Sequence, residues 1–216
     1  MTALPKQAKI AALFRQAVAI HVLTIEKVEH AVPLAKALVA GGVRTLEVTL
    51  RTDAAVEAAR AMIAEVPDAI VGIGTILNPD DLSRARALGA KFGISPGATP
   101  ELLNAAAAGD LPFAPGIATA SELMQALASG FDVVKFFPAE QSGGIGALRA
   151  LAGPFPQIRV CPTGGIGDAN AASWLAEPNV LCVGGSWLCP AADIRAGNWA
   201  GITAMCDRAM KSLKAA

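Results

Sequence analysis

Lys135 stands in an apolar setting that could give a lysine covalent chemistry. It lies in the run Val-Val-Lys-Phe-Phe, with two large apolar residues on each side. An ordinary lysine, with a pKa near 10.4, presents about one neutral amine in 2,500 at pH 7. Burial favours the neutral, nucleophilic amine that attacks a carbonyl carbon to form a Schiff base. The alternative is a lysine that extends from a strand end into solvent.

A carboxylate and a guanidinium share one face of another apolar segment. Residues 45–51 read Thr-Leu-Glu-Val-Thr-Leu-Arg, so in a strand Glu47, Thr49 and Arg51 point the same way. We expect Glu47 to transfer protons beside a buried amine and Arg51 to bind an anionic group of the substrate. Mutual neutralisation of Glu47 and Arg51 is the alternative interpretation.

Two glycine-rich turns follow the last two apolar runs of the chain. One contains Gly164 and Gly165, and the other contains Gly184 and Gly185. Glycines let backbone N–H groups approach an anion closely, and the N-terminus of a following helix would add its dipole. Tight turns between strands and helices also use glycine, so either turn alone says little. The presence of both favours phosphate binding.

These groups need elements that position them, and short β-branched runs alternate with helical patterns along the chain. Asn78-Pro79 and Thr99-Pro100 are typical of helix starts. The predicted helices cover 28–39, 54–64, 79–88, 100–108, 121–128 and 145–151, and the predicted strands cover 17–24, 43–50, 69–73, 91–95, 111–114, 131–136, 158–161 and 180–183.

Eight such units in 216 residues leave 27 residues for each, which predicts an α/β fold, a (β/α)8 TIM barrel. We expect one domain over residues 1–216, with residues 1–16 as an N-terminal helical extension. The active site of such a barrel lies at the carboxyl ends of its strands, with phosphate held after the last two. The alternative, a doubly wound open sheet, would need a dinucleotide-binding fingerprint that the sequence lacks.

Composition excludes several classes of function. The chain has 18 Lys and Arg against 18 Asp and Glu and no basic run, which argues against general nucleic-acid binding. No apolar stretch reaches the ~18 residues of a membrane helix, and the apolar run near the N-terminus lacks the features of a signal peptide. The four cysteines and two histidines have no metal-binding spacing, so we expect no metal and reduced, buried thiols in the cytoplasm.

Taken together, the motifs resemble the KDPG/KHG aldolase family, which acts on 2-dehydro-3-deoxy-6-phosphogluconate (KDPG). The resemblance covers about residues 29–190 and rests on segments that begin at Leu46, Ser95, Lys135, Cys161 and Gly184: Leu-Glu-Val-Thr-Leu-Arg-Thr, Ser-Pro-Gly, Lys-Phe-Phe-Pro-Ala-Glu, Cys-Pro-Thr-Gly-Gly-Ile and Gly-Gly-Ser-Trp. It implies a class I, metal-independent aldolase without cofactors. It also implies a cytoplasmic homotrimer that yields pyruvate in the Entner–Doudoroff route, with related activity on 4-hydroxy-2-oxoglutarate (KHG).

The resemblance also assigns roles to residues. It implies that Lys135 forms the Schiff base and that Glu47 is the general acid and base. The positions that match the family's substrate-binding residues are Arg51 and Thr75 for the carboxylate, Pro96 and Phe137 for the pyruvyl pocket, and Thr163, Gly164, Gly165, Gly184, Gly185 and Ser186 for the hydroxylated chain and phosphate.

Two positions depart from the family pattern. His21 interrupts a first strand that usually contains Pro-Val-Ile or Pro-Val-Leu, and we expect a buried strand histidine rather than a polar group of the pocket. Ile73 stands between two glycines where a small residue is usual, and we expect it to tighten packing near Thr75.

Other functions stay open on the residues alone. A 2-dehydro-3-deoxy-6-phosphogalactonate aldolase would differ only in the stereochemistry at C4 of its substrate. A non-covalent, phosphate-binding barrel isomerase would use Lys135 only as an anion contact. A binding protein without activity is disfavoured because Glu47, Lys135 and Arg51 are all present.

Overall fold

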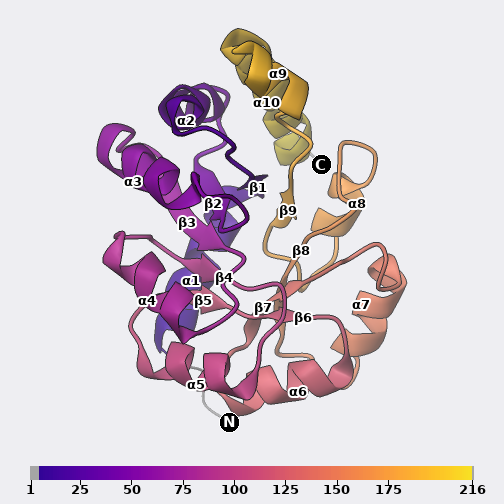
Figure 1. Ribbon diagram of the computed structural model, residues 1–216. Coiled ribbons are helices and arrows are strands. Elements are labelled where there is room, and N and C mark those ends of the chain that lie inside the picture. The colour runs from indigo at the N-terminus through magenta and orange to yellow at the C-terminus, as the bar shows by residue number, and fades with distance from the viewer. Residues whose placement is uncertain (1–4, 216) are drawn as a thin grey trace.

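The computed structural model describes residues 5–215. The first four residues of the expected N-terminal extension, and Ala216, lie outside this range. Helices and strands alternate along the chain (Figure 1). The strands are β1 (Ala19–Leu23), β2 (Thr45–Thr49), β3 (Ile70–Gly74), β4 (Gly93–Ile94), β5 (Phe113–Ala114), β6 (Gly116–Ile117), β7 (Val133–Phe136), β8 (Arg159–Pro162) and β9 (Val183–Gly185).

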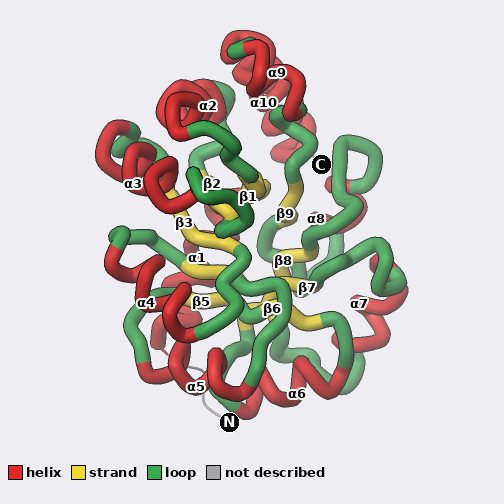
Figure 2. Tube along the Cα trace, viewed as in Figure 1, coloured by secondary structure: helices red, strands yellow, loops and turns green. Residues whose placement is uncertain are grey.

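Helices surround the strands on the outside of the molecule (Figure 2). They are α1 (Pro5–Ala17), the short 3-10 helix η1 (Val28–His30), α2 (Ala31–Ala40), α3 (Ala55–Glu65), α4 (Pro79–Ala87), α5 (Pro100–Ala108), α6 (Ala120–Ala128), α7 (Gly144–Ala152), α8 (Ala171–Leu175), α9 (Ala191–Ala196) and α10 (Trp199–Ala215). Within residues 5–215, no helix has both the length and the apolar character needed to cross a membrane.

The prediction of a closed eight-stranded TIM barrel is wrong. The strands form a six-stranded parallel sheet in the order β5-β4-β3-β2-β1-β9 and a separate three-stranded parallel sheet in the order β6-β7-β8. Pro115, between β5 and β6, has no N–H to continue a ladder, so the chain pairs with β4 before it and with β7 after it. At the other junction only isolated bridges, such as that between Thr163 and Gly184, join β8 to the β9 segment.

Side chains on the strands divide between two apolar clusters. Leu46, Val48 and Ile73 belong to the large cluster beneath the outer helices, whereas Phe92 belongs to a smaller cluster between the sheets. Helix α1 contributes Phe14 to the smaller cluster, where its ring meets that of Phe92 edge to face at 6.0 Å. Since α1 occupies the end where the strands begin, the carboxyl ends of the strands are left for a site.

Gln7 of α1 bridges the two sheets at their broken junction. This fully buried side chain donates from Nε2 to the carbonyl oxygen of Phe113 in β5 at 2.9 Å. Its Oε1 accepts the backbone N–H of Val133 in β7, also at 2.9 Å. The side-chain amide of Gln7 thus makes one hydrogen bond to the backbone of each sheet, at the place where the two sheets do not pair with each other.

Gln7→Ala is therefore expected to lower the free energy of unfolding by about 2–4 kcal/mol, because two buried backbone groups lose their partner. Urea denaturation measures this change. Gln16→Ala, at an exposed position on the same helix, is the matched control and should change stability by less than about 0.5 kcal/mol. Equal stability of the two variants would contradict the bridging role.

Candidate active site

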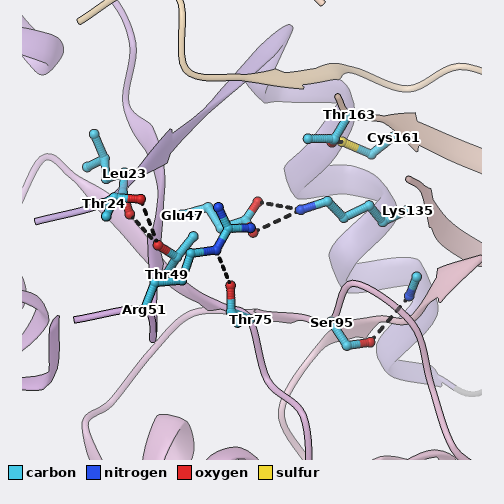
Figure 3. A network of polar contacts seen from close by, with 11 residues as sticks. Leu23, Thr24, Glu47, Thr49, Arg51, Thr75, Ser95, Lys135, Cys161 and Thr163 are labelled. Atoms are coloured by element: carbon cyan, nitrogen blue, oxygen red, sulfur yellow. Dashed lines mark hydrogen bonds and ion pairs between the residues drawn. The ribbon is translucent and has the colours of Figure 1, made fainter. Parts of the chain in front are cut away.

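Lys135 and Glu47 form a buried pair between the two sheets. Lys135 is the third residue of β7 and Glu47 the third residue of β2. Nζ of Lys135 lies 3.0 Å from Oε1 and 3.3 Å from Oε2 of Glu47, and the two side chains are 5% and 2% exposed (Figure 3). An amine at this distance from a carboxylate can exchange a proton with it directly.

Gly74 leaves the space that Glu47 fills. Gly74 ends β3, which pairs with β2 in parallel register. A Cβ atom at position 74 would lie 2.6 Å from Cγ of Glu47 and 2.7 Å from its carboxylate carbon. Any side chain at this position would push the carboxylate from its place beside Lys135. This close approach could not be predicted from the sequence, because it joins residues of two strands that are 27 positions apart.

Two buried thiols lie close to the lysine and the carboxylate. Cys161 of β8 pairs in register with Lys135, and burial, together with the nearby Cys161 and Glu47, raises the pKa of the Cys182 thiol. Cys182 therefore stays a protonated thiol at neutral pH. Across residues 5–215, no three side chains of the His, Cys, Asp or Glu type gather where they could hold a metal ion.

Arg51 and Thr75 form a second pair at the carboxyl ends of β2 and β3. Nε of Arg51 donates to Oγ1 of Thr75 at 3.1 Å, and the Arg51 side chain is exposed (Figure 3). Glu47 has Lys135 as its ion-pair partner, so neutralisation of Arg51 by Glu47 is not what the structure contains. Thr75 has φ +58°, a left-handed conformation that is costly for a β-branched residue. Such backbone strain is typical of functional sites.

Phe137 lies beside Lys135, and Pro96 lies beside the strand partner of Lys135. The Phe137 ring centre is 5.4 Å from Nζ of Lys135, within range of a cation–π contact. Pro96 packs its backbone against Gly116, and Gly116 is the residue of β6 that pairs in register with Lys135. Both predicted pocket residues are therefore close to the lysine along the sheet.

The two glycine turns are neighbours in space. An isolated bridge joins Thr163 to Gly184, and a Cβ atom at position 184 would lie 3.2 Å from that of Thr163. Gly164 and Gly165 have φ of +102° and +76°, conformations that favour glycine. Gly185 ends β9, and the exposed Ser186 follows it.

The helices that follow these turns are short and begin several residues after the glycines. The first helix after Gly165 is α8, which begins at Ala171, and the first after Gly185 is α9, which begins at Ala191. Both helices are short, with five and six residues. Anion binding at the turns would therefore depend on backbone N–H groups and Ser186.

The two departures from the family pattern lie away from Lys135. Nε2 of the fully buried His21 lies 2.7 Å from Sγ of Cys189, while Nδ1 has no partner among the described residues. Burial lowers the pKa of His21 to about 3, so the ring is neutral at pH 7. Ile73 packs into the cluster beneath the helices, on the face of β3 opposite Gly74. Its expected effect on the packing near Thr75 stays a prediction.

Known proteins resemble this chain over almost its whole length. The family model described as KDPG and KHG aldolase matches residues 10–205. The KHG/KDPG aldolase of Escherichia coli K12 is 56% identical over 193 residues, which are 89% of this chain and 91% of the relative. The alignment with the 2-dehydro-3-deoxy-phosphogluconate aldolase of Dickeya dadantii shows 57% identity over 88% of this chain and 89% of that protein.

Solved structures agree with these matches. KDPG aldolase from Legionella pneumophila, with pyruvate captured at low pH as a covalent carbinolamine intermediate, aligns with a TM-score of 0.90 and 46% identity. The alignment covers 92% of this chain and 97% of the other.

Proposed function

The chain belongs to the KDPG and KHG aldolase family, and from this premise we propose that Lys135 forms the Schiff base and that Glu47 transfers the protons. The enzyme is a class I lyase that cleaves KDPG to pyruvate and glyceraldehyde 3-phosphate, and the related activity on KHG is named among its relatives. One observation carries the residue assignment: a buried lysine with its amine 3.0 Å from a buried carboxylate.

The first half of the proposed mechanism forms an iminium. Glu47 accepts a proton from Nζ of Lys135, and the neutral amine attacks the C2 carbonyl carbon of the substrate. The carbinolamine that results loses its hydroxyl group as water, with Glu47 returning the proton to the departing oxygen. Lys135 and the substrate are then joined by a protonated C=N bond.

The second half breaks the C3–C4 bond. Glu47, again a carboxylate, accepts the proton of the C4 hydroxyl. The O–H electron pair forms the carbonyl of the leaving aldehyde, and the C3–C4 pair moves into the iminium, which acts as an electron sink. Glyceraldehyde 3-phosphate leaves. Glu47 then gives its proton to C3 of the enamine, which restores an iminium. Water adds to this iminium, and its breakdown frees pyruvate and regenerates the amine of Lys135.

We also propose roles for the residues around this pair. Arg51 and Thr75 would bind the substrate carboxylate, which their hydrogen-bonded pairing at the strand ends supports. Phe137 and Pro96 would line the pyruvyl pocket. The phosphate and hydroxylated chain would be held by Thr163, Gly164, Gly165, Gly184, Gly185 and Ser186, whose two turns are adjacent.

Ser186→Ala is expected to raise KM for KDPG by about tenfold with little change in kcat, because one hydrogen bond to a charged phosphate is lost. The exposed position of Ser186 makes a folding defect from this change small. Steady-state kinetics with KDPG and KHG measure the effect. An unchanged KM for KDPG, or an equal loss with the phosphate-free substrate, would count against the role.

Trapping with borohydride tests the covalent assignment. The protein is incubated with pyruvate, reduced with sodium borohydride, digested and mapped by mass spectrometry. We expect the reduced pyruvyl adduct on Lys135. Its absence there, in an enzyme that still turns over, would sink the mechanism and favour the non-covalent isomerase. Comparison of both C4 epimers as substrates checks the galactonate alternative, which relatives named for the gluconate do not favour.

Three further expectations remain proposals. We propose a homotrimer in the cytoplasm, built from one domain over residues 1–216 with residues 1–16 as its helical extension. The four buried free cysteines suit a reducing compartment. Sedimentation equilibrium that gave a mass other than three copies would refute the trimer.

A further inference from the structure

A polar network outside the Lys135–Glu47 pair holds the turn that contains Gly165. Nδ2 of Asn170 donates to the carbonyl oxygen of Gly165 at 3.1 Å and to Oε1 of Glu140 at 3.0 Å. Oδ1 of Asn170 accepts the N–H of Gly167 at 2.9 Å. Nε1 of Trp174 donates to the same Glu140 oxygen at 2.7 Å. Both ends of the Asn170 amide are therefore engaged, which fixes its orientation.

The loop after β7 also holds this turn directly. The N–H of Glu140 donates to the carbonyl oxygen of Gly164 at 3.1 Å. The side chain of Glu140 also approaches Gly165 so closely that a Cβ atom there would lie 2.6 Å from its Cγ. Glu140 thus meets the turn with its backbone, its methylene groups and, through Asn170, its carboxylate.

This network determines where the N–H groups of the turn point. In a trans peptide the N–H points opposite to the C=O of the same unit. The carbonyl oxygens of Gly164 and Gly165 are both held by donors of the network, so the N–H groups of Gly165 and Ile166 point away from it. Neither N–H donates to another group within residues 5–215. Two backbone N–H groups in a glycine-rich turn that are left for a ligand suit an oxyanion.

We propose that Asn170 is a positioning residue for the phosphate of the substrate, acting with Glu140 and Trp174 to orient the N–H groups of Gly165 and Ile166. The inference rests on the proposed function and deepens it, because it identifies what sets the preference for a phosphorylated substrate over one without phosphate. Asn170 touches neither the phosphate nor the reacting carbon. Its effect passes through the backbone of the turn.

The experiment compares kcat and KM for KDPG and for KHG, which has no phosphate, in wild type, Asn170→Ala and Glu140→Ala. Each variant is expected to raise KM for KDPG about tenfold, which is the scale of one misaligned hydrogen bond to a charged group. The value of kcat for KDPG, and both kcat and KM for KHG, should stay within about twofold of wild type. Inhibition of KHG cleavage by inorganic phosphate should weaken by the same factor.

Two further variants make the test specific. Glu140→Gln keeps an oxygen that can accept from Asn170 and Trp174, so it should restore most of the affinity lost in Glu140→Ala. Asn104→Ala, at an exposed position on α5, is the matched control and should behave as wild type. If Asn170→Ala does not fold, the variants Glu140→Ala and Glu140→Gln still allow KM for KDPG to be compared with KM for KHG.

The outcomes separate this inference from the proposed function. An equal rise in KM, or an equal fall in kcat, for KDPG and KHG would mean that Asn170 has a purely structural role and would overturn the inference. An unchanged KM for KDPG would overturn it as well. A wild-type protein that forms the adduct on Lys135 and cleaves KDPG keeps the proposed function in either case. A wild type without the adduct would overturn the proposed function itself.

Discussion

Lys135→Ala is expected to abolish the cleavage of KDPG, with a loss in kcat of roughly 10⁴-fold or more. In the proposed mechanism this amine forms the C=N bond with the substrate, and the carboxylate of Glu47 cannot replace it. The borohydride-trapped adduct with pyruvate should disappear together with turnover. A coupled assay for pyruvate and mass spectrometry of the reduced protein measure the two losses.

The same substitution also leaves Glu47 buried without its partner, at 2% exposure, which costs stability. Lys135→Arg separates the chemistry from the fold, since the guanidinium keeps a positive charge beside Glu47 but cannot form the Schiff base. We expect an inactive protein with a Tm closer to that of wild type. Lys91→Ala, at an exposed position before β4, is the control and should keep full activity. Normal turnover in Lys135→Arg would refute the assignment.

Gly74→Ala is expected to lower kcat by about 100-fold, the usual scale for a catalytic group misplaced by about 1 Å. The added methyl group would lie 2.6 Å from Cγ of Glu47, so the carboxylate must move away from Nζ of Lys135. KM should change less than kcat, because the atoms nearest the added methyl group belong to Glu47 and not to Arg51 or the glycine turns. Steady-state kinetics and the rate of adduct formation with pyruvate measure the change.

The control for this variant is Gly146→Ala in α7, where a Cβ atom meets open space. It should keep wild-type activity and gain slightly in stability, because alanine favours a helix more than glycine does. If Gly74→Ala kept the wild-type kcat, Glu47 would have room to adjust without consequence, and its position would not matter for proton transfer. A large fall in Tm with unchanged kcat would assign Gly74 to packing alone.

The elements that carry the two central residues could be predicted from the sequence. The strand expected over 43–50 is β2, Thr45–Thr49, and that expected over 131–136 is β7, Val133–Phe136. The predicted helix starts at Asn78 and Thr99 are confirmed, since both side chains accept a backbone N–H three residues later. Alternation within a strand and capping at a helix start are local properties, so the sequence reports them directly.

Features that depend on distant partners could not be predicted. The division into two sheets depends on which strands meet across Pro115, and β6 has only two residues, too few for a periodic pattern. Helices α8 and α9, with five and six residues, are too short to show a helical pattern in the sequence and were not predicted. The fit of Gly74 against Glu47 and the bonds of Asn170 to the glycine turn join segments that only the fold brings together.

Gln7 has a consequence for how the protein is made. Its two partners, Phe113 and Val133, stand 106 and 126 residues further along the chain. At a synthesis rate of about 5–20 residues per second, helix α1 waits roughly 6–25 s on the ribosome before its binding groove exists. During that time Ile10, Ala11 and Phe14, which are buried in the finished protein, lack the part of their apolar cluster that Ala114 and Val133 supply. The apolar cluster around α1 is therefore completed only after β7 has been synthesised.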